Sequence, residues 1–343
     1  MVDKIEAIIL DWAGTTMDLW CVAPVEAFKW AFKEVKDIEL TFLEVRQPMG
    51  KNKLLHIQEL LQMDSVQQKW LKAYGRVPDV MTEANEIFES FVPKQIEILK
   101  KYNQLIPGTL DSIREFRERG VEIGSTTGYT NSMMKILLAE SKKQGYFPDV
   151  VVCSEGGHYV RKGNSSIYTS HDLKGRKANL SRPGPGMCNL NAALLGVSDN
   201  AACLKLGDTL DDCREGIAAG MWTGAFAGTG NEMYMLEDEI HLTEEEAKAR
   251  DLDGYSKKLL AGFKNMSEIG YKGKIIRPDI ITDGIKRGSE VHDLVNRLIG
   301  KGLEPGEYAK SHGSIWISND KLVMKTYAQR RKKAGHCGKC CKC

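Results

Sequence analysis

A short apolar run at residues 5–10 ends at Asp11, and this run restricts the fold more than any other feature. Its aliphatic and β-branched side chains are typical of a strand covered on both faces, as in parallel sheets flanked by helices. No further strand signal follows until after residue 101, because the segments between residues 23 and 101 all have helical periodicity. The sequence therefore predicts one strand followed directly by an all-helical insertion.

Strand and helix patterns alternate from residue 106 onward. We predict strands within residues 121–130, 149–154, 203–209 and 221–228, with helices between them. This repetition indicates a Rossmann-like, doubly wound parallel sheet, which is an α/β fold. We expect residues 1–19 and 104–299 to form this core, and residues 20–103 to form a helical cap domain. A polar insertion at residues 155–180 and a C-terminal extension at 300–343 fit the pattern poorly.

Charge is distributed unevenly along the 343 residues, although 48 Lys and Arg against 46 Asp and Glu give a net charge of only +2. The last 18 residues contain six basic and no acidic side chains, so the first 325 carry an excess of four acidic ones. An acidic body gives no electrostatic reason to expect nucleic-acid binding. We expect a cytoplasmic protein, because no long apolar segment suggests a signal peptide or membrane span and five cysteines are scattered through the body.

The extreme C-terminus combines a basic run at residues 330–333 with four cysteines, Cys337, Cys340, Cys341 and Cys343. One CxxC spacing is present, but no second pair completes a zinc site. We expect a solvated terminus, with metal or partner binding as the alternative.

Three predicted strands end in loops rich in polar residues: DWAGTT at 11–16, STTGYT at 125–130 and GDTLDD at 207–212. Ligands of open α/β sheets bind beyond the carboxyl ends of the strands, so Asp11 and Asp208 would converge there. Two carboxylates suit a hard cation such as Mg²⁺. Asp212, one helical turn after Asp208, would orient the water shell of the metal, and Thr209 would support the same loop.

Donors for a tetrahedral oxyanion would come from the glycine-containing turn after Asp11, from Thr126 and from Arg182. These groups predict a phosphoryl site, at which an aspartate can form an aspartyl-phosphate. Each residue alone is more often a strand-end cap or a turn former. Three matching loops in one chain favour the phosphoryl site.

These loops, with Arg182 between the second and third, resemble the four motifs of the haloacid dehalogenase superfamily. The resemblance implies that Asp11 is a nucleophile and that the helical cap is inserted at this point. Many phosphatases of the superfamily have a general acid two residues after the nucleophile. Ala13 occupies that position here, which indicates a leaving group that does not need this acid.

The cap segment at residues 48–56 offers a lysine in place of that acid. Lys53, desolvated beneath a cap, would have a lowered pKa and could attack an aldehyde. The protonated imine would accept the electrons of a breaking carbon–phosphorus bond. His56 lies on the same helical face as Lys53, whereas Lys51 points about 200° away from it.

With these cap residues included, the chain resembles the phosphonatase family, whose members hydrolyse phosphonoacetaldehyde to acetaldehyde and phosphate. The resemblance implies a nucleophilic Asp11, a Schiff-base Lys53, a proton-relaying His56 and a homodimer joined through the caps. It further implies Mg²⁺ held by Asp11, Asp208 and the Ala13 carbonyl. The substrate would be bound by Thr126, Arg182, Met49, Cys21, Tyr129 and Gly128.

The segment around Arg182 departs from the family, which usually reads Gly-Arg-Pro-Tyr-Pro-Trp-Met where this chain has SRPGPGM. Glycines at 184 and 186 remove two aromatic side chains from that wall of the pocket. The insertion at 155–180, with His158, Tyr159, Arg161, Lys162 and His171, could refill the space or form a surface loop. A different phosphonate aldehyde, a phosphate ester or a non-catalytic binding role remain alternatives.

Overall fold

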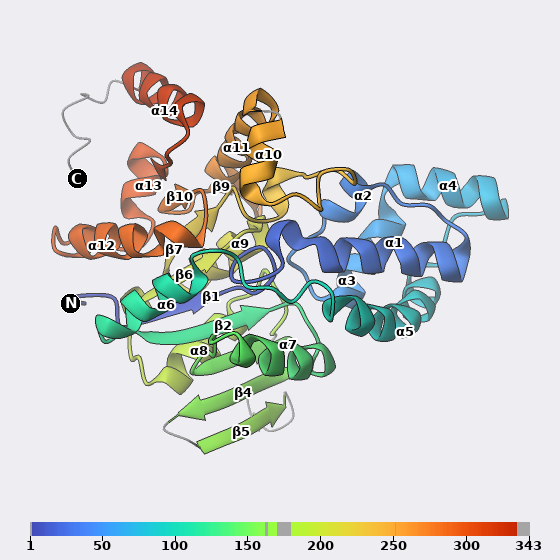
Figure 1. The fold of residues 1–343 in the computed structure, drawn as a ribbon, viewed down its shortest axis with the longest axis horizontal. Helices are drawn as coiled ribbons and strands as arrows, with labels where there is room; N and C mark the ends of the chain where they lie inside the picture. Colours follow the sequence, from blue (N-terminus) through green and yellow to red (C-terminus); the bar gives the residue numbers. More distant parts are fainter. Residues whose placement is uncertain (1, 162–163, 170–179, 251, 335–343) are drawn as a thin grey trace.

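The computed structural model describes residues 2–161, 164–169, 180–250 and 252–334 (Figure 1). Lys162, His171 and the four C-terminal cysteines lie outside the described residues, and so do the roles predicted for them.

A nine-stranded sheet in the order β11-β10-β7-β6-β1-β2-β3-β4-β5 forms the centre of the described structure. Its strands are β1 (Ala7–Leu10), β2 (Glu122–Thr127), β3 (Val150–Cys153), β4 (Gly156–Arg161), β5 (Asn164–Thr169), β6 (Cys203–Gly207), β7 (Trp222–Phe226), β10 (Ile280–Thr282) and β11 (Ile315–Ile317). The pairings from β11 to β3 are all parallel. The predicted doubly wound α/β fold is therefore confirmed.

Strand β1 is buried on both faces, as its apolar run predicts. Ala7 and Ile9 belong to the core beneath α8 (Gly186–Leu195), whereas Ile8 and Leu10 belong to the opposite core. That second core includes residues of α6 (Thr109–Glu118) and α12 (Gly288–Ile299). The alternation of side chains along a strand thus assigns neighbouring residues to two separate apolar layers.

The cap consists of five helices between β1 and α6: α1 (Val22–Lys36), α2 (Phe42–Arg46), α3 (Lys53–Gln62), α4 (Asp64–Tyr74) and α5 (Val80–Leu99). Phe28 of α1 stacks on Phe91 of α5 with ring centroids 4.3 Å apart. Figure 1 shows these helices gathered at the right, beyond one end of the sheet. The division of the chain at residues 20 and 103 stays a prediction.

Two linkers join the cap to the core, and they lie side by side. Ile106 donates its backbone N–H to the carbonyl of Thr16 at 2.9 Å, and Asp18 donates to the carbonyl of Gln104 at 3.1 Å. Met17 and Leu105 form an isolated antiparallel bridge between these contacts. The chain therefore enters and leaves the cap through one hydrogen-bonded ribbon.

The two segments that fit the sequence pattern poorly both extend the sheet. The polar insertion supplies β4 and β5, an antiparallel hairpin paired with β3 at one edge. The C-terminal extension supplies α13 (Glu307–His312), β11 and α14 (Lys321–Lys333), and β11 pairs in parallel with β10 at the other edge. Residues 300–334 are therefore integrated into the core fold, which the sequence pattern did not predict.

The remaining described elements lie on the core: α7 (Asn131–Lys143), α9 (Leu210–Ala218), α10 (Glu244–Arg250), α11 (Leu252–Ser267) and the hairpin of β8 (Ile269–Tyr271) and β9 (Lys274–Ile276). Across the described ranges, every helix is too short or too polar to traverse a lipid bilayer.

Trp316 is the apolar anchor of the C-terminal extension. Its indole N–H donates to Ser267 Oγ at 3.1 Å, and its ring stacks on Tyr327. We expect Trp316→Ala to lower the free energy of unfolding by about 3–5 kcal/mol, because it removes a buried aromatic side chain. Chemical denaturation measures this, with Leu322→Ala on the exposed side of α14 as the control, for which we expect a change of about 0.5 kcal/mol or less. Equal effects of the two substitutions would show that the extension is loosely attached.

Candidate active site

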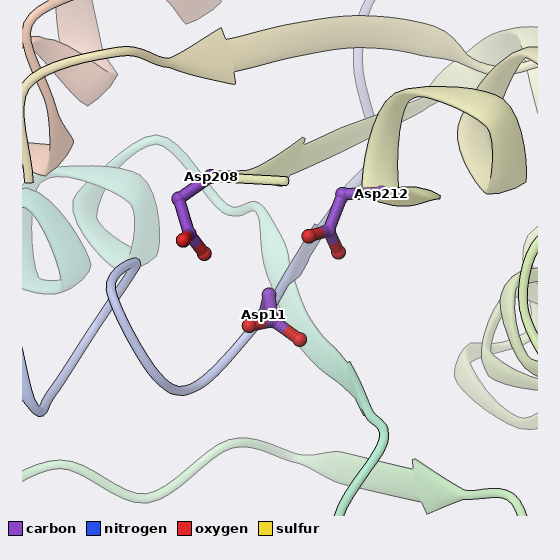
Figure 2. Close-up of side chains that lie close together, drawn as sticks. All are labelled: Asp11, Asp208 and Asp212. Atoms are coloured by element: carbon purple, nitrogen blue, oxygen red, sulfur yellow. The ribbon is translucent and has the colours of Figure 1, made fainter. Parts of the chain in front are cut away.

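Strand register brings the three predicted loops to one edge of the sheet. Leu10 of β1 lies opposite Ser125 of β2 and Leu206 of β6. Asp11, Thr126 and Asp208 come one or two residues after these aligned positions, so they lie at nearly the same height along the strands. Figure 2 shows the carboxylates of Asp11, Asp208 and Asp212 facing one another from the ends of β1 and β6 and from the start of α9.

Arg182 lies at the centre of a buried network of hydrogen bonds and ion pairs. Its Nη2 donates to Asp11 Oδ1 at 2.6 Å and to Thr126 Oγ1 at 2.9 Å. The same nitrogen lies 2.9 Å from Asp212 Oδ1, and Nε donates to Glu215 Oε2 at 2.8 Å. Burial opposes the charge, but the charges of Asp212, Asp11 and Glu215 outweigh it and raise the pKa of Arg182 above its usual value. Arg182 thus holds Asp11, the candidate nucleophile, beside Thr126, a candidate for phosphoryl binding.

Asp212 contacts two buried cations, whereas the sequence predicted that it would orient the water shell of a metal. Thr209 Oγ1 donates to Asp212 Oδ2 at 2.6 Å in a capping box at the start of α9. Lys205 Nζ donates to Asp212 Oδ1 at 2.7 Å. Although burial acts in the other direction, Arg182 and Lys205 keep the pKa of Asp212 below its usual value. Asp212 is therefore an anchor for the two cations, and its role in orienting metal-bound water stays a prediction.

Lys205 and Glu215 also belong to this network, although neither was predicted from the sequence. Both side chains are fully buried, and Glu215 Oε2 accepts hydrogen bonds from Arg182 and from Thr126 Oγ1. A signal was present: Lys205 lies within a predicted buried strand and Glu215 within a predicted core helix. Charged side chains in such positions are rarely buried without partners.

Asp208 is buried beside the other two acids and fits the role of metal ligand. Thr15 Oγ1 donates to its Oδ1 at 2.9 Å, and the backbone N–H of Asn231 donates to its Oδ2 at 2.9 Å. Burial raises the pKa values of Asp208 and Asp11, and the charges of the neighbouring acids raise them further.

One oxygen from each of Asp11, Asp208 and Asp212 lies within 4.8 Å of the others. A divalent cation would relieve the mutual repulsion of these buried acids, and the oxygen donors suit a hard metal. The residues present therefore fit a divalent metal ion.

Lys53, at the first position of α3, is the amine buried above this cluster. Only 6% of the residue is exposed, and Nζ lies 4.8 Å from the ring centroid of Tyr129 and 5.6 Å from that of Phe28. Burial lowers the pKa of Lys53 to about 8. The rival Lys51 forms an ion pair with Glu59, although Lys51 also contributes to the lining of the cavity that contains Lys53 and Asp11.

His56 lies one turn after Lys53 and is fully buried. Its Nε2 is 2.9 Å from the carbonyl oxygen of Val45, and its ring stacks on Phe28 at a centroid distance of 3.9 Å. Within the described part of the chain, Nδ1 has no hydrogen-bond partner. Burial, with the charge of Lys53 as a smaller cause, lowers the pKa of His56 well below its ordinary value.

The helix of Lys53 begins directly after its N-cap Asn52, and residues 47–50 form a turn before it. Gly50 has a φ of +99°, and a Cβ there would lie 2.4 Å from Thr209 Oγ1. A Cβ on Gly128 would lie 2.5 Å from the Lys51 carbonyl oxygen. These two glycines permit the cap turn to approach the core loops closely.

The cap and core enclose a cavity of about 20 Å³. It is lined by Asp11, Ala13, Cys21, Pro24, Met49, Gly50, Lys51, Lys53, Thr127, Gly128, Tyr129, Arg182 and Thr209. Predicted residues from the cap and from the core therefore line the same small cavity. Gly184 and Gly186 are not among the lining residues, and the widening expected from the loss of the two aromatic side chains stays a prediction.

A larger hollow of about 1060 Å³ lies elsewhere, between cap residues 29–43 and 69–73 and core residues 236–238. It is open, and its charges pair at the surface, as Lys29 does with Glu237 at 3.2 Å. It does not contain the converging buried groups that distinguish the smaller cavity.

Comparisons with known proteins identify relatives over most of the chain. A phosphonoacetaldehyde hydrolase of Syntrophobacter fumaroxidans is 35% identical over 301 residues, which are 88% of this chain and 95% of that protein. A phosphonoacetaldehyde hydrolase of Bacillus cereus strain B4264 is 39% identical over 251 residues, covering 72% of this chain and 83% of that protein. No family model matches the chain.

A bifunctional phosphonoacetaldehyde hydrolase/aminoethylphosphonate transaminase of Clostridioides difficile is 37% identical over 249 residues. The match covers 72% of this chain but only 36% of that longer protein. Among solved structures, a phosphonoacetaldehyde hydrolase-like protein from Oleispira antarctica superposes with a TM-score of 0.68 at 30% identity, over 88% of this chain and 96% of that one.

The surroundings of His56 predict that it stays neutral across the physiological pH range. We expect the ring resonances of His56 in an NMR titration to keep the chemical shifts of a neutral imidazole between pH 8 and pH 5.5, because a buried imidazolium would lose its hydration beside Lys53. The resonances are assigned by their disappearance in His56→Gln. A titration midpoint above pH 6 would contradict the buried, neutral state.

Proposed function

The chain belongs to the phosphonoacetaldehyde hydrolase family, and we propose that it cleaves the carbon–phosphorus bond of phosphonoacetaldehyde, giving acetaldehyde and phosphate. The observation that carries this proposal is the small cavity shared by Lys53 and Asp11, with Ala13 where a leaving-group acid would stand. A buried amine and a buried carboxylate suit a substrate that contains an aldehyde and a phosphonate. The reaction needs both groups within one small space.

The first step in this proposal is imine formation at Lys53. With a pKa of about 8, roughly one tenth of the amine is neutral at pH 7. The neutral nitrogen attacks the aldehyde carbon, the resulting carbinolamine takes up a proton from solvent and loses water, and a protonated imine forms. The rings of Tyr129 and Phe28 lie near Nζ and favour its cationic form by cation–π attraction.

Cleavage then follows at Asp11. Its free carboxylate oxygen attacks phosphorus, the electrons of the carbon–phosphorus bond move into the iminium group, and an enamine remains on Lys53. Because the electrons end on nitrogen, no acid at position 13 is required. Proton transfer to carbon and hydrolysis of the imine release acetaldehyde, while a second water hydrolyses the aspartyl-phosphate to phosphate. We propose that His56 assists the proton transfers.

The phosphoryl group would be held by Arg182 and Thr126, both hydrogen-bonded in the buried network beside Asp11. We propose that Mg²⁺ is the divalent cation and that Asp11, Asp208 and the Ala13 carbonyl hold it. When bound, Mg²⁺ neutralises charge on the phosphoryl oxygens. Met49, Cys21, Tyr129 and Gly128 line the cavity and, in this proposal, shape the space around the small aldehyde.

We further propose a cytoplasmic homodimer joined through the caps. Five apolar side chains of the cap are strongly exposed, and Met81 is 62% exposed; they are Leu43, Leu71, Tyr74, Val77 and Met81. Apolar surface of this kind favours association of two copies. Five cysteines of the described core and linker are free thiols, which supports a reducing compartment.

Trapping with borohydride tests the imine. We expect the wild-type protein with phosphonoacetaldehyde and borohydride to gain a covalent adduct at Lys53, detected by peptide mass spectrometry. Lys53→Arg should lose the adduct and at least about a thousandfold of turnover, since arginine cannot form the imine. Lys51→Arg serves as the matched control and should keep the adduct. Turnover without modification of Lys53 would refute the imine.

Asp11→Asn separates the two steps of the reaction. We expect it to keep the borohydride adduct at Lys53 while releasing no phosphate, because the amide cannot attack phosphorus.

A phosphate-ester substrate tests the alternative function. If esters were hydrolysed and aldehyde phosphonates were not, the phosphate-ester alternative would replace our proposal.

The pH dependence follows from the pKa of Lys53. Burial lowers that value to about 8, so the neutral amine increases as pH rises through 8. The initial rate of adduct formation at subsaturating substrate should therefore increase about fivefold between pH 7 and pH 8 and level off above pH 9. A rate that still rises nearly tenfold between pH 8 and pH 9 would indicate a solvated lysine, whose pKa is about 10.4.

A further inference from the structure

Arg46, the last residue of α2, is a fully buried arginine outside the catalytic residues described above. Its Nη1 donates to the carbonyl oxygen of Trp20 at 2.9 Å and approaches Asn231 Oδ1 at 3.4 Å. Within the described part of the chain, Nε and Nη2 have no hydrogen-bond partner. The charges of Asp18, Asp208 and Glu232 act on Arg46 without a direct ion pair. An apolar side chain would avoid this cost of burial, so the position of Arg46 calls for an explanation other than a salt bridge.

The first partner, Asn231, connects Arg46 to Asp208. Asn231 Nδ2 donates to the Arg46 carbonyl oxygen at 3.0 Å, so the two residues exchange hydrogen bonds in both directions. The backbone N–H of Asn231 donates to Asp208 Oδ2 at 2.9 Å. A cap residue therefore holds the core loop that orients Asp208.

The second partner, Trp20, directly precedes a residue that also contacts Asp208 Oδ2. Cys21 follows it in the chain, and Cys21 Sγ donates to Asp208 Oδ2 at 3.2 Å. Asp18, Trp20 and Cys21 all have positive φ angles, between 54° and 65°, which non-glycine residues rarely adopt. Such a backbone persists only where its surroundings hold it in place, and Arg46 supplies one of those contacts.

Asp208 Oδ2 thus accepts hydrogen bonds from two groups that depend on the Arg46 guanidinium. One is the backbone N–H of Asn231, whose side chain contacts Arg46. The other is the thiol of Cys21, which follows the Arg46 partner Trp20 in the chain. We propose that Arg46 is a positioning residue which couples docking of the cap to the placement of Asp208. When the cap is docked, the Arg46 contacts orient the 20–21 segment and the Asn231 loop, and the Asp208 carboxylate takes its closed-state position. When the cap separates, both donors to Oδ2 lose that support.

The proposal rests on the proposed function only in taking Asp208 as a metal ligand. Its test needs no substrate, so a failure to cleave phosphonoacetaldehyde would not affect it. The first measurement is alkylation of Cys21 by iodoacetamide in the folded protein, followed by peptide mass spectrometry. Cys213, fully buried in the core, reports global unfolding in the same sample.

We expect Arg46→Met and Asn231→Ala each to increase the rate of Cys21 alkylation about tenfold without a matching increase at Cys213. Arg46→Lys retains a donor and should recover part of the protection. The matched control is Arg76→Met, which removes a cap arginine that is paired with Glu83 and remote from the site. It should leave Cys21 unchanged.

The second measurement is Mg²⁺ affinity by calorimetry, and it separates positioning from simple charge. A purely electrostatic Arg46 would repel the cation, so Arg46→Met would tighten Mg²⁺ binding. Positioning predicts the opposite, a dissociation constant about tenfold higher in both Arg46→Met and Asn231→Ala. The double variant should be no weaker than the worse single variant, because both remove the same support.

Each of four results would overturn the proposal. Two concern alkylation: an unchanged rate at Cys21 in both variants, or parallel increases at Cys21 and Cys213. The other two concern Mg²⁺: tighter binding in Arg46→Met, or additive effects in the double variant. If Arg46→Met does not fold, Asn231→Ala decides the question. It preserves every charge and removes both side-chain contacts with Arg46.

Discussion

The buried guanidinium of Arg182 is the interaction on which the site depends. Four acceptor groups converge on it from β1, β2 and α9, so it compensates the charge of carboxylates that would otherwise repel one another inside the protein. Its Nη1 also lies 3.3 Å from the carbonyl oxygen of Gly50 in the cap. One side chain thereby joins the sheet, the helix that follows β6 and the cap, and removing it would leave several buried acids unpaired.

The fold of the core and the order of its elements were predictable because the necessary signals are local. A buried strand such as β1 is visible as an apolar run, and its end at Asp11 is visible as a change to polar residues. The same reasoning located Asp208 and Thr126, since parallel strands deliver their carboxyl ends to one edge. Lys53 was predictable from its place on a cap helix together with the resemblance to a known family.

What sequence reasoning missed depends on contacts between distant residues. Strand β11 has three residues and owes its place to pairing with β10 and to the packing of Trp316 on Phe263, neither of which is visible locally. Glu215 and Lys205 look like ordinary charged residues until the helix and strand that carry them face Arg182. Arg46 is similar, because its partners Trp20 and Asn231 are 26 and 185 positions away.

The paired linkers at residues 16–18 and 104–106 determine how substrate can reach a cavity of about 20 Å³. A space of that size admits little more than a water molecule, so the cap has to move before any aldehyde can enter. Contacts at the seam, such as that of Asn52 Nδ2 with Ser181 Oγ at 2.8 Å, must then break. The ribbon of linkers can remain hydrogen-bonded while they do. A cap attached through an intact ribbon is held at both its entry and its exit, which limits the positions that its amine can take relative to the core carboxylate.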